Sequence, residues 1–187
     1  MTKLSIAGAF VSSNKVHGDS RGFFREWFKS SDLDKQGVDF KPVQGNFSMS
    51  NRGALRGLHF SISEQGQDKL VSCMYGEVLD VIVDLRIGSP TYLSVEKVVL
   101  KADLGDVLFI PSGVGHSFLA VSDTAAVSYL TSSEYDAENE KTISPLDPEL
   151  GIQWPVLDGI EFSLSDRDLI APTLKEAKAL GHLPTFR

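Results

Sequence analysis

Short apolar runs separated by turn residues fill the middle of the chain. Between residues 43 and 131, runs rich in Val, Ile, Leu, Phe and Tyr alternate with Gly, Pro, Asn, Asp or Ser. This spacing is typical of β-strands joined by tight turns. It predicts eight strands, at residues 43–48, 55–60, 69–74, 78–85, 92–100, 107–110, 117–121 and 125–131.

Helix signals are confined to the two ends of the chain. Ser31 can cap a short helix that Gly37 ends, and Pro172 can begin a second helix that runs to Gly181. Many short strands without long helices between them favour an antiparallel sandwich or jelly roll. An early apolar segment, residues 4–11, predicts a further strand at which two subunits could pair. No repeat or linker divides the sequence, so we expect one domain over residues 1–187.

Charged residues interrupt the apolar runs, and strand parity indicates where they point. In residues 78–85, Asp80 and Asp84 share one face, which either lines a polar cavity or meets water. Lys69 shares its face with apolar residues of the run 69–75, which favours a cation that points inward.

Arg56 and His59 lie in the same predicted strand but have opposite parity. They would therefore point to opposite faces of an ideal strand. Both can reach one site only if Gly57 marks a bulge or if Arg56 reaches in from the rim.

The composition suits a compact protein, which we expect to be soluble and cytoplasmic. At 187 residues with 42% apolar content, the chain can bury a substantial core. No apolar run approaches the roughly 20 residues that a membrane helix needs, and the first residues lack a signal-peptide core. A net charge of −7 disfavours a nucleic-acid surface, which needs clustered Lys and Arg. An anionic small molecule can still bind where a few cations converge.

The four histidines do not form a metal-binding pattern. His17 and His182 are expected to be exposed, whereas His59 and His116 lie in strand-rich segments. A jelly-roll metal site usually has two histidines separated by one residue, a glutamate and a later histidine. The single cysteine, Cys73, also excludes a cysteine-based zinc cluster. We therefore expect no metal and no other cofactor.

His59, Lys69 and Tyr129 together would suit proton transfer next to a carbonyl group. A histidine, with an ordinary pKa of about 6.5, is an effective base near neutral pH. A lysine ammonium can stabilise the enolate oxygen that forms when a carbon next to a ketone loses its proton. A phenol on the opposite face, such as Tyr129, could return a proton there and invert the carbon. Taken alone, Tyr129 would instead be a packing residue of the core or its rim.

Other enzyme classes lack their signatures in this sequence. It contains no Gly-x-Ser-x-Gly elbow and no histidine close to Cys73, which disfavours a nucleophilic hydrolase. Phosphate-loop and dinucleotide fingerprints are absent as well.

Several motifs, in their order and spacing, resemble the dTDP-4-dehydrorhamnose 3,5-epimerase family over nearly the whole chain. They are residues 18–24, 55–60, 69–71, 84–86 with 89–91, 110–118 and 164–168. The resemblance implies an all-β, double-stranded β-helix jelly roll (cupin-like) with short terminal helices. It also implies a cofactor-independent epimerase that binds a dTDP-4-keto-6-deoxyhexose and forms a homodimer with a shared nucleotide site.

The resemblance assigns roles to five residues of the sugar site. His59 would be the base that removes the proton next to the C4 ketone, and Asp168 would orient His59. Tyr129 would be the proton donor, and Lys69 the cation that stabilises the enolate. His116 would be a second histidine near the sugar. Without the resemblance, Asp168 would be a helix-capping or solvated acid.

The same resemblance assigns nucleotide contacts. Arg56 and Arg167 would meet the diphosphate or nearby polar groups, and guanidinium groups suit phosphate oxygens. Tyr135 would stack on the thymine ring, and Glu140 would be another substrate contact. The remaining nucleoside-binding positions, some of them supplied by the partner subunit, would be Arg21, Phe23, Glu26, Gln44 and Asn46.

Two departures favour a member from antibiotic deoxysugar pathways. Ser61 stands where the rhamnose branch commonly has glutamine, and residues 113–116 read Gly-Val-Gly-His in place of Gly-Phe-Ala-His. Some epimerases of those pathways invert only C3 or only C5, so a single-centre epimerase stays open beside the 3,5-epimerase. A ketoisomerase that shares the fold and the nucleotide is an equally near alternative. More remote alternatives are a metal-dependent cupin oxygenase and a non-catalytic sugar-nucleotide-binding jelly roll.

Overall fold

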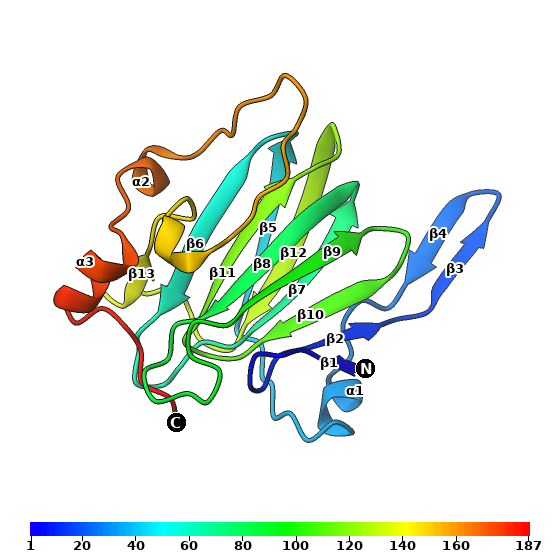
Figure 1. Ribbon diagram of the computed structural model, residues 1–187. Coiled ribbons are helices and arrows are strands. Elements are labelled where there is room, and N and C mark those ends of the chain that lie inside the picture. Colours follow the sequence, from blue (N-terminus) through cyan, green and yellow to red (C-terminus); the bar gives the residue numbers. More distant parts are fainter.

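The computed structural model describes residues 1–187 and contains two antiparallel β-sheets that face each other (Figure 1). The six-stranded sheet has the order β1-β2-β10-β7-β12-β5, and the five-stranded sheet has the order β13-β6-β11-β8-β9. The predicted jelly roll is confirmed. The strands are β1 Thr2–Lys3, β2 Phe10–Ser13, β3 Val16–Asp19, β4 Gly22–Arg25, β5 Gln44–Asn51, β6 Leu55–Ser61, β7 Lys69–Tyr75, β8 Glu77–Asp84, β9 Val95–Lys101, β10 Asp106–Ile110, β11 Val114–Ala120, β12 Thr124–Thr131 and β13 Glu140–Thr142.

All eight strands predicted for residues 43–131 are present, with shifted ends. The largest errors at a start are in β9 and β11. β9 begins at Val95 because the preceding residues form a turn with Leu93 at a φ of 64°. The strand expected at residues 4–11 is wrong over most of its length, because only Phe10 and Val11 lie in a strand, at the start of β2. Residues 4–9 connect β1 to β2 in a hairpin, where Leu4 N–H donates to the carbonyl of Ala9.

The helices are short and lie near the two ends, as expected. They are α1 Ser30–Asp34, the 3₁₀ helix η1 Pro148–Leu150, α2 Asp166–Leu169 and α3 Leu174–Ala179. Ser31 does not cap α1, because the helix already begins one residue earlier. Thr173, not Pro172, begins α3, where it forms a capping box with Glu176.

The five-stranded sheet is covered on both faces, which explains why β8 and β11 are almost continuously buried. On its inner face, Ile82 and Phe118 belong to the same core cluster as Val71 and Val127 of the six-stranded sheet. On its outer face, Val81, Val83 and Leu85 pack in one cluster with Leu174 and Ala177 of α3. Asp80 and Asp84 are fully buried, so their shared face points into the protein and not to water.

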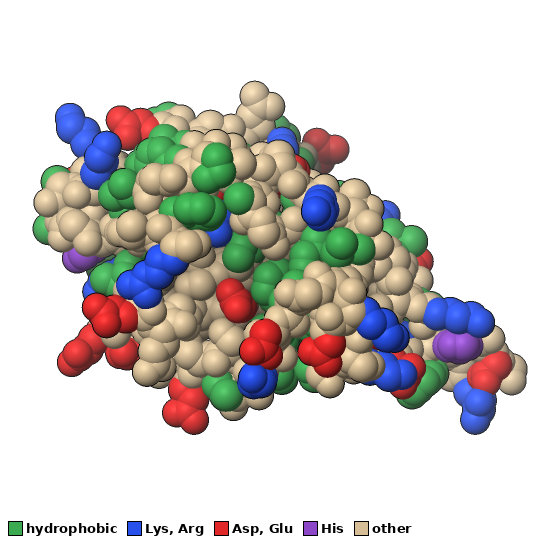
Figure 2. Space-filling view, turned by 90° about the horizontal axis from the view of Figure 1, so that it is seen from below, with side chains coloured by type: hydrophobic (Ala, Val, Ile, Leu, Met, Phe, Trp, Pro, Cys, Tyr) green, Lys and Arg blue, Asp and Glu red, His purple; other side chains and the backbone are tan.

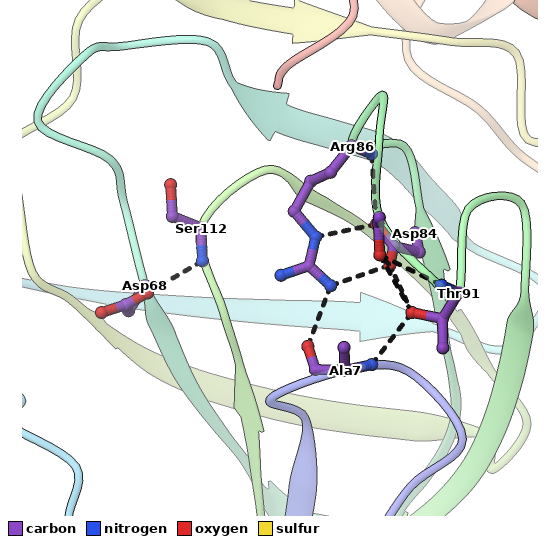
Figure 3. Close-up of polar contacts among 7 residues, drawn as sticks. Ala7, Asp68, Asp84, Arg86, Thr91 and Ser112 are labelled. Atoms are coloured by element: carbon purple, nitrogen blue, oxygen red, sulfur yellow. Dashed lines mark hydrogen bonds and ion pairs between the residues drawn. The ribbon is translucent and has the colours of Figure 1, made fainter. Parts of the chain in front are cut away.

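A hydrogen-bond network around Asp84 joins the N-terminal hairpin to the end of β8 (Figure 3). The Asp84 carboxylate accepts hydrogen bonds from Nε and Nη2 of Arg86, both at 2.8 Å. The hydroxyls of Ser89 and Thr91 donate to it at 2.6 Å. Arg86 also donates to the carbonyl of Ala7 at 2.9 Å. Burial raises the pKa of Asp84, but these hydrogen bonds outweigh it and lower the pKa to about 2.

Asp84→Asn is expected to lower the free energy of unfolding by about 3–5 kcal/mol near neutral pH, because it leaves the buried Arg86 without its counterion. The carboxylate contributes stability above its unfolded-state pKa of about 3.9, and this contribution is lost as the pH falls through about 2. The difference between wild type and variant should therefore shrink as the pH falls from about 4 to about 2. Urea denaturation across this range measures it.

Asp123→Asn is the matched control, because the Asp123 side chain is 98% exposed. It should change the free energy of unfolding by less than about 0.5 kcal/mol. If the difference between wild type and Asp84→Asn were the same at neutral and acidic pH, the buried ion pair would not be its cause.

Candidate active site

A bulge in β6 brings Arg56 and His59 to the same side of the strand. His59 lies opposite His116 on β11, but Arg56 lies opposite Phe118, so the register shifts by one residue between them. Gly57 has a φ of 106°, which favours glycine. A Cβ atom at this position would lie 2.4 Å from the carbonyl oxygen of His116. The bulge predicted as one of two possibilities is therefore present at Gly57.

A cavity of about 430 Å³ lies between the two sheets, on the side of this bulge. The four predicted catalytic residues, His59, Lys69, Tyr129 and Asp168, all line it. The other lining residues are Ser48, Ala54, Leu55, Arg56, His116, Phe118, Glu140, Ser163, Leu164 and Ser165.

His59 and Asp168 form a hydrogen-bonded pair in the cavity wall. Nε2 of His59 lies 2.7 Å from Oδ1 of Asp168, whose residue is only 3% exposed. Ser165 caps α2 by accepting the N–H of Asp168, and the N–H of Gly57 donates to Oδ2 at 3.4 Å. Burial raises the pKa of Asp168, but the contacts with His59 and Ser165 outweigh it and hold the pKa below its ordinary value. The carboxylate therefore stays charged and fixes the orientation of the imidazole.

Lys69 and Tyr129 enter the cavity from the six-stranded sheet, and His59 and His116 enter it from the five-stranded sheet. Burial lowers the pKa of Lys69, while the charges of Glu140 and Asp80 raise it. Burial and the charge of Glu140 raise the pKa of Tyr129, so its phenol keeps its proton near neutral pH. An acid and a base thus face the same space from opposite walls.

His116 forms a second pair, with a residue that is absent from the predicted site. Its Nε2 lies 2.8 Å from Oδ2 of Asp80 on the neighbouring strand β8. His116 is 7% exposed and Asp80 is fully buried. Strand parity left open whether Asp80 points inward or to water. Its partner was not predictable either, because the pairing of β8 with β11 is not encoded in either strand alone.

Four of the predicted nucleotide contacts lie around the cavity without lining it. Gln44 donates to Asn46 at 2.9 Å and accepts the N–H of Tyr135 at 2.7 Å. Asn46 lies opposite Tyr129 in the sheet, so this polar group borders the phenol. Arg167 follows the cap of α2, one residue before Asp168.

Three of the predicted nucleotide contacts lie far from the cavity within a single chain: Arg21, Phe23 and Glu26. Arg21 and Phe23 belong to the β3–β4 hairpin, which projects away from the sheets (Figure 1). Figure 2 shows this end of the molecule as a narrow extension that carries basic, acidic and histidine side chains. Phe23 and Phe24 are 52% and 66% exposed there. A single chain does not bring these residues to the cavity that holds His59.

No group of three or more His, Cys, Asp or Glu side chains is arranged to hold a metal ion. None of the helices has the length and apolar content required to cross a membrane.

Three comparisons relate the chain to known proteins. A family model described as dTDP-4-dehydrorhamnose 3,5-epimerase matches residues 3–176. A dTDP-4-dehydrorhamnose 3,5-epimerase of Streptomyces griseus is 46% identical, over 100% of this chain and 92% of the relative. A dTDP-4-dehydro-6-deoxyglucose 3-epimerase of Streptomyces bikiniensis is 45% identical, over 100% of this chain and 95% of the relative. The crystal structure of ChmJ, a 3'-monoepimerase from Streptomyces bikiniensis in complex with dTDP-quinovose, is 46% identical, with a TM-score of 0.91 over 99% of this chain and 93% of that chain.

Gly57→Ala is expected to destabilise the protein strongly, because the new Cβ would meet backbone atoms of His116 and Ser117 at 2.4 and 2.9 Å. The cost should be several times the roughly 1–2 kcal/mol of an alanine in a merely left-handed position. Gly159→Ala is the control, since Gly159 has a φ of 71° and nothing within 4 Å of an added Cβ. Equal losses of unfolding free energy in the two variants would contradict the tight fit at the bulge.

Proposed function

The chain belongs to the dTDP-4-dehydrorhamnose 3,5-epimerase family, and from this premise we propose that its cavity binds a dTDP-4-keto-6-deoxyhexose and inverts C3 and C5. The observation that carries the proposal is the shared cavity. His59 and Tyr129 enter it from opposite sheets, and Lys69 lies in the same space.

The first step is removal of a proton from a carbon next to the C4 ketone. His59 takes this proton as general base, and the charged Asp168 stabilises the imidazolium that results. The electron pair of the broken C–H bond forms a double bond to C4, and the electron pair of the C4=O double bond moves to the oxygen, which becomes an enolate oxygen. The ammonium of Lys69, held in a cavity largely closed to water, stabilises the charge on that oxygen.

The second step returns a proton to the opposite face of the same carbon. The phenol of Tyr129 donates it, and the enolate collapses to the ketone with the carbon inverted. Because burial keeps Tyr129 protonated, the group is a donor at the start of the step. The proton on His59 and the charge on Tyr129 are then exchanged with solvent, which returns the site to its initial state.

The nucleotide is proposed to occupy the rim of the cavity. Arg56 lines the cavity, and with Arg167 it offers guanidinium groups to the diphosphate. Tyr135 is 55% exposed and is therefore free to stack on the thymine ring, while Gln44 and Asn46 offer hydrogen bonds to the base. His116 and Glu140 line the cavity as further sugar contacts.

A homodimer would place the projecting hairpin at a partner's site. Arg21 and Phe23 lie on that hairpin, and Glu26 follows it directly, at a position from which the chain's own cavity is not reached. The outer face of the six-stranded sheet also exposes Phe47 and Met49, which two copies could bury together. A monomer in sedimentation experiments at enzyme concentrations used for turnover would contradict this arrangement.

A single-centre epimerase is the second candidate. The Streptomyces bikiniensis relative, at 45% identity, is named for inversion at C3 alone, and it matches this chain as well as the 3,5-epimerases do. Ser61 and Val114, which mark the departures from the rhamnose branch, do not line the cavity. They therefore give no direct reason for a different outcome at C5.

We expect deuterium to enter both C3 and C5 when the protein is incubated with dTDP-4-keto-6-deoxyglucose in D₂O. NMR of the recovered sugar locates the label. Deuterium at C3 alone would establish the single-centre epimerase. No incorporation at either carbon, with the nucleotide sugar still bound, would overturn the proposed chemistry in favour of a binding protein.

His59→Ala and Tyr129→Phe should each lower turnover by roughly 10²- to 10⁴-fold, because each removes one proton-transfer group. Neither side chain is part of the packed core, so the thermal unfolding curve should stay close to wild type. His182→Ala, which replaces a histidine outside the cavity, is the control and should turn over normally. Near-native proton exchange in His59→Ala would show that another group is the base.

A further inference from the structure

The buried carboxylate of Asp80 has no role in the proposed proton transfers. Asp80 lies opposite Phe118, and His116 lies opposite Ile82, so the two polar residues are diagonal neighbours on one face of the sheet. Oδ2 of Asp80 meets Nε2 of His116 at 2.8 Å. Oδ1 is buried and has no hydrogen-bond partner. The carboxylate is thus fully buried with only half of its hydrogen-bonding capacity used.

A charge in such surroundings is costly unless another charge compensates it. The neighbours of Asp80 on the inner face of the sheet, Val78, Ile82 and Phe118, are apolar. Lys69 is in the complementary position. It is 5% exposed, enters the same cavity as His116 from the facing sheet and forms no ion pair of its own.

We propose that Asp80 is a positioning residue for the epimerisation: it orients the ring of His116 and, together with Glu140, keeps the ammonium of Lys69 charged. This inference rests on the proposed function, since a charged Lys69 matters for the reaction only if an enolate forms beside it. It adds to that function a second histidine–aspartate pair with a task different from the pair of His59 and Asp168.

Asp80 shares this task with Glu140. Asp168 is paired with His59, and Arg56 is itself a cation that opposes a charge on Lys69. Glu140 lines the cavity, is half-buried and favours a charged Lys69 more strongly than Asp80 does. Tyr129 is neutral while it carries its proton. Of the two carboxylates that favour a charged Lys69, Asp80 is the fully buried one.

The test is the titration of Lys69 in ligand-free protein, followed by ¹³C NMR of the lysine side chains, with Lys69→Met to assign the signal. Asp80→Asn keeps the shape and removes the charge, and it should lower the midpoint of the Lys69 titration by about one pH unit or more. Asp84→Asn is the matched control. It removes an equally buried charge from the same strand, outside the cavity, and should leave the midpoint in place.

Proton exchange at C3 should follow the titration. Above the wild-type midpoint, Asp80→Asn should exchange roughly tenfold more slowly than wild type for each pH unit by which the midpoint falls, while folded Asp84→Asn should not. A midpoint of Lys69 that is the same in Asp80→Asn and wild type would overturn the proposal. Because the titration requires no substrate, it still reports on Asp80 if the epimerisation itself fails its D₂O test.

A second measurement keeps the proposal testable if Asp80→Asn does not fold. In the wild-type protein, ¹⁵N NMR of His116 should show Nε2 carrying a proton, because the charged Asp80 can only accept that hydrogen bond. An unprotonated Nε2 would mean that Asp80 is neutral and donates, and the proposal would be wrong.

Discussion

The bulge at Gly57 is the constraint on which the arrangement of the cavity depends. A strand directs successive side chains to opposite faces, so a regular β6 would turn either Arg56 or His59 away from the lumen. One extra residue corrects this, but only where the added backbone fits against β11. Glycine meets that condition, because any Cβ would collide with the carbonyl of His116. Arg56 and His59 therefore share one wall of the cavity because of a residue without a side chain.

Burial then sets the chemistry of the groups that the bulge brings together. The facing sheets exclude most water from Lys69, Asp168 and Asp80, so each charge acts on its neighbours at low screening. The hydrogen bonds of Asp168 overcome the effect of burial and keep the carboxylate charged, whereas Tyr129, which has no such partner, keeps its proton. The same environment thus holds a carboxylate anion beside His59 and a neutral phenol on the opposite wall. If the same residues were exposed to solvent, screening would weaken the interactions that make Asp168 an anion and Tyr129 a neutral phenol in this cavity.

Much of the fold could be predicted from the sequence, and the errors have physical reasons. The buried strands were recognisable because both faces of β8 and β11 are covered, which leaves long apolar runs. The hairpin β3–β4 was not, because its polar, exposed residues bury nothing in the chain's own core. Residues 4–9 read as a strand because Ile6 and Ala9 are apolar and buried, yet they close a turn. In the site, strand parity favoured the inward direction of Lys69 and left the bulge as one of two possibilities. Tyr129 was a candidate for its chemistry alone, whereas Asp168 followed only from resemblance. The pair of Asp80 with His116 depends on which strands are neighbours, and no local pattern contains that information.

The catalytic groups alone do not determine whether one carbon or two are inverted. C3 and C5 flank the same ketone, so one enolate-stabilising cation serves either deprotonation, and the base and the acid remain on the same two walls. What differs is the position of each carbon relative to His59 and Tyr129, and a proton transfer tolerates little displacement. The outcome therefore depends on the groups that hold the ring in the cavity, among them the buried hydroxyl of Ser48, which has no partner in the protein and lines the same space. A change at such a contact would alter the product without any change in the proposed acid, base or cation.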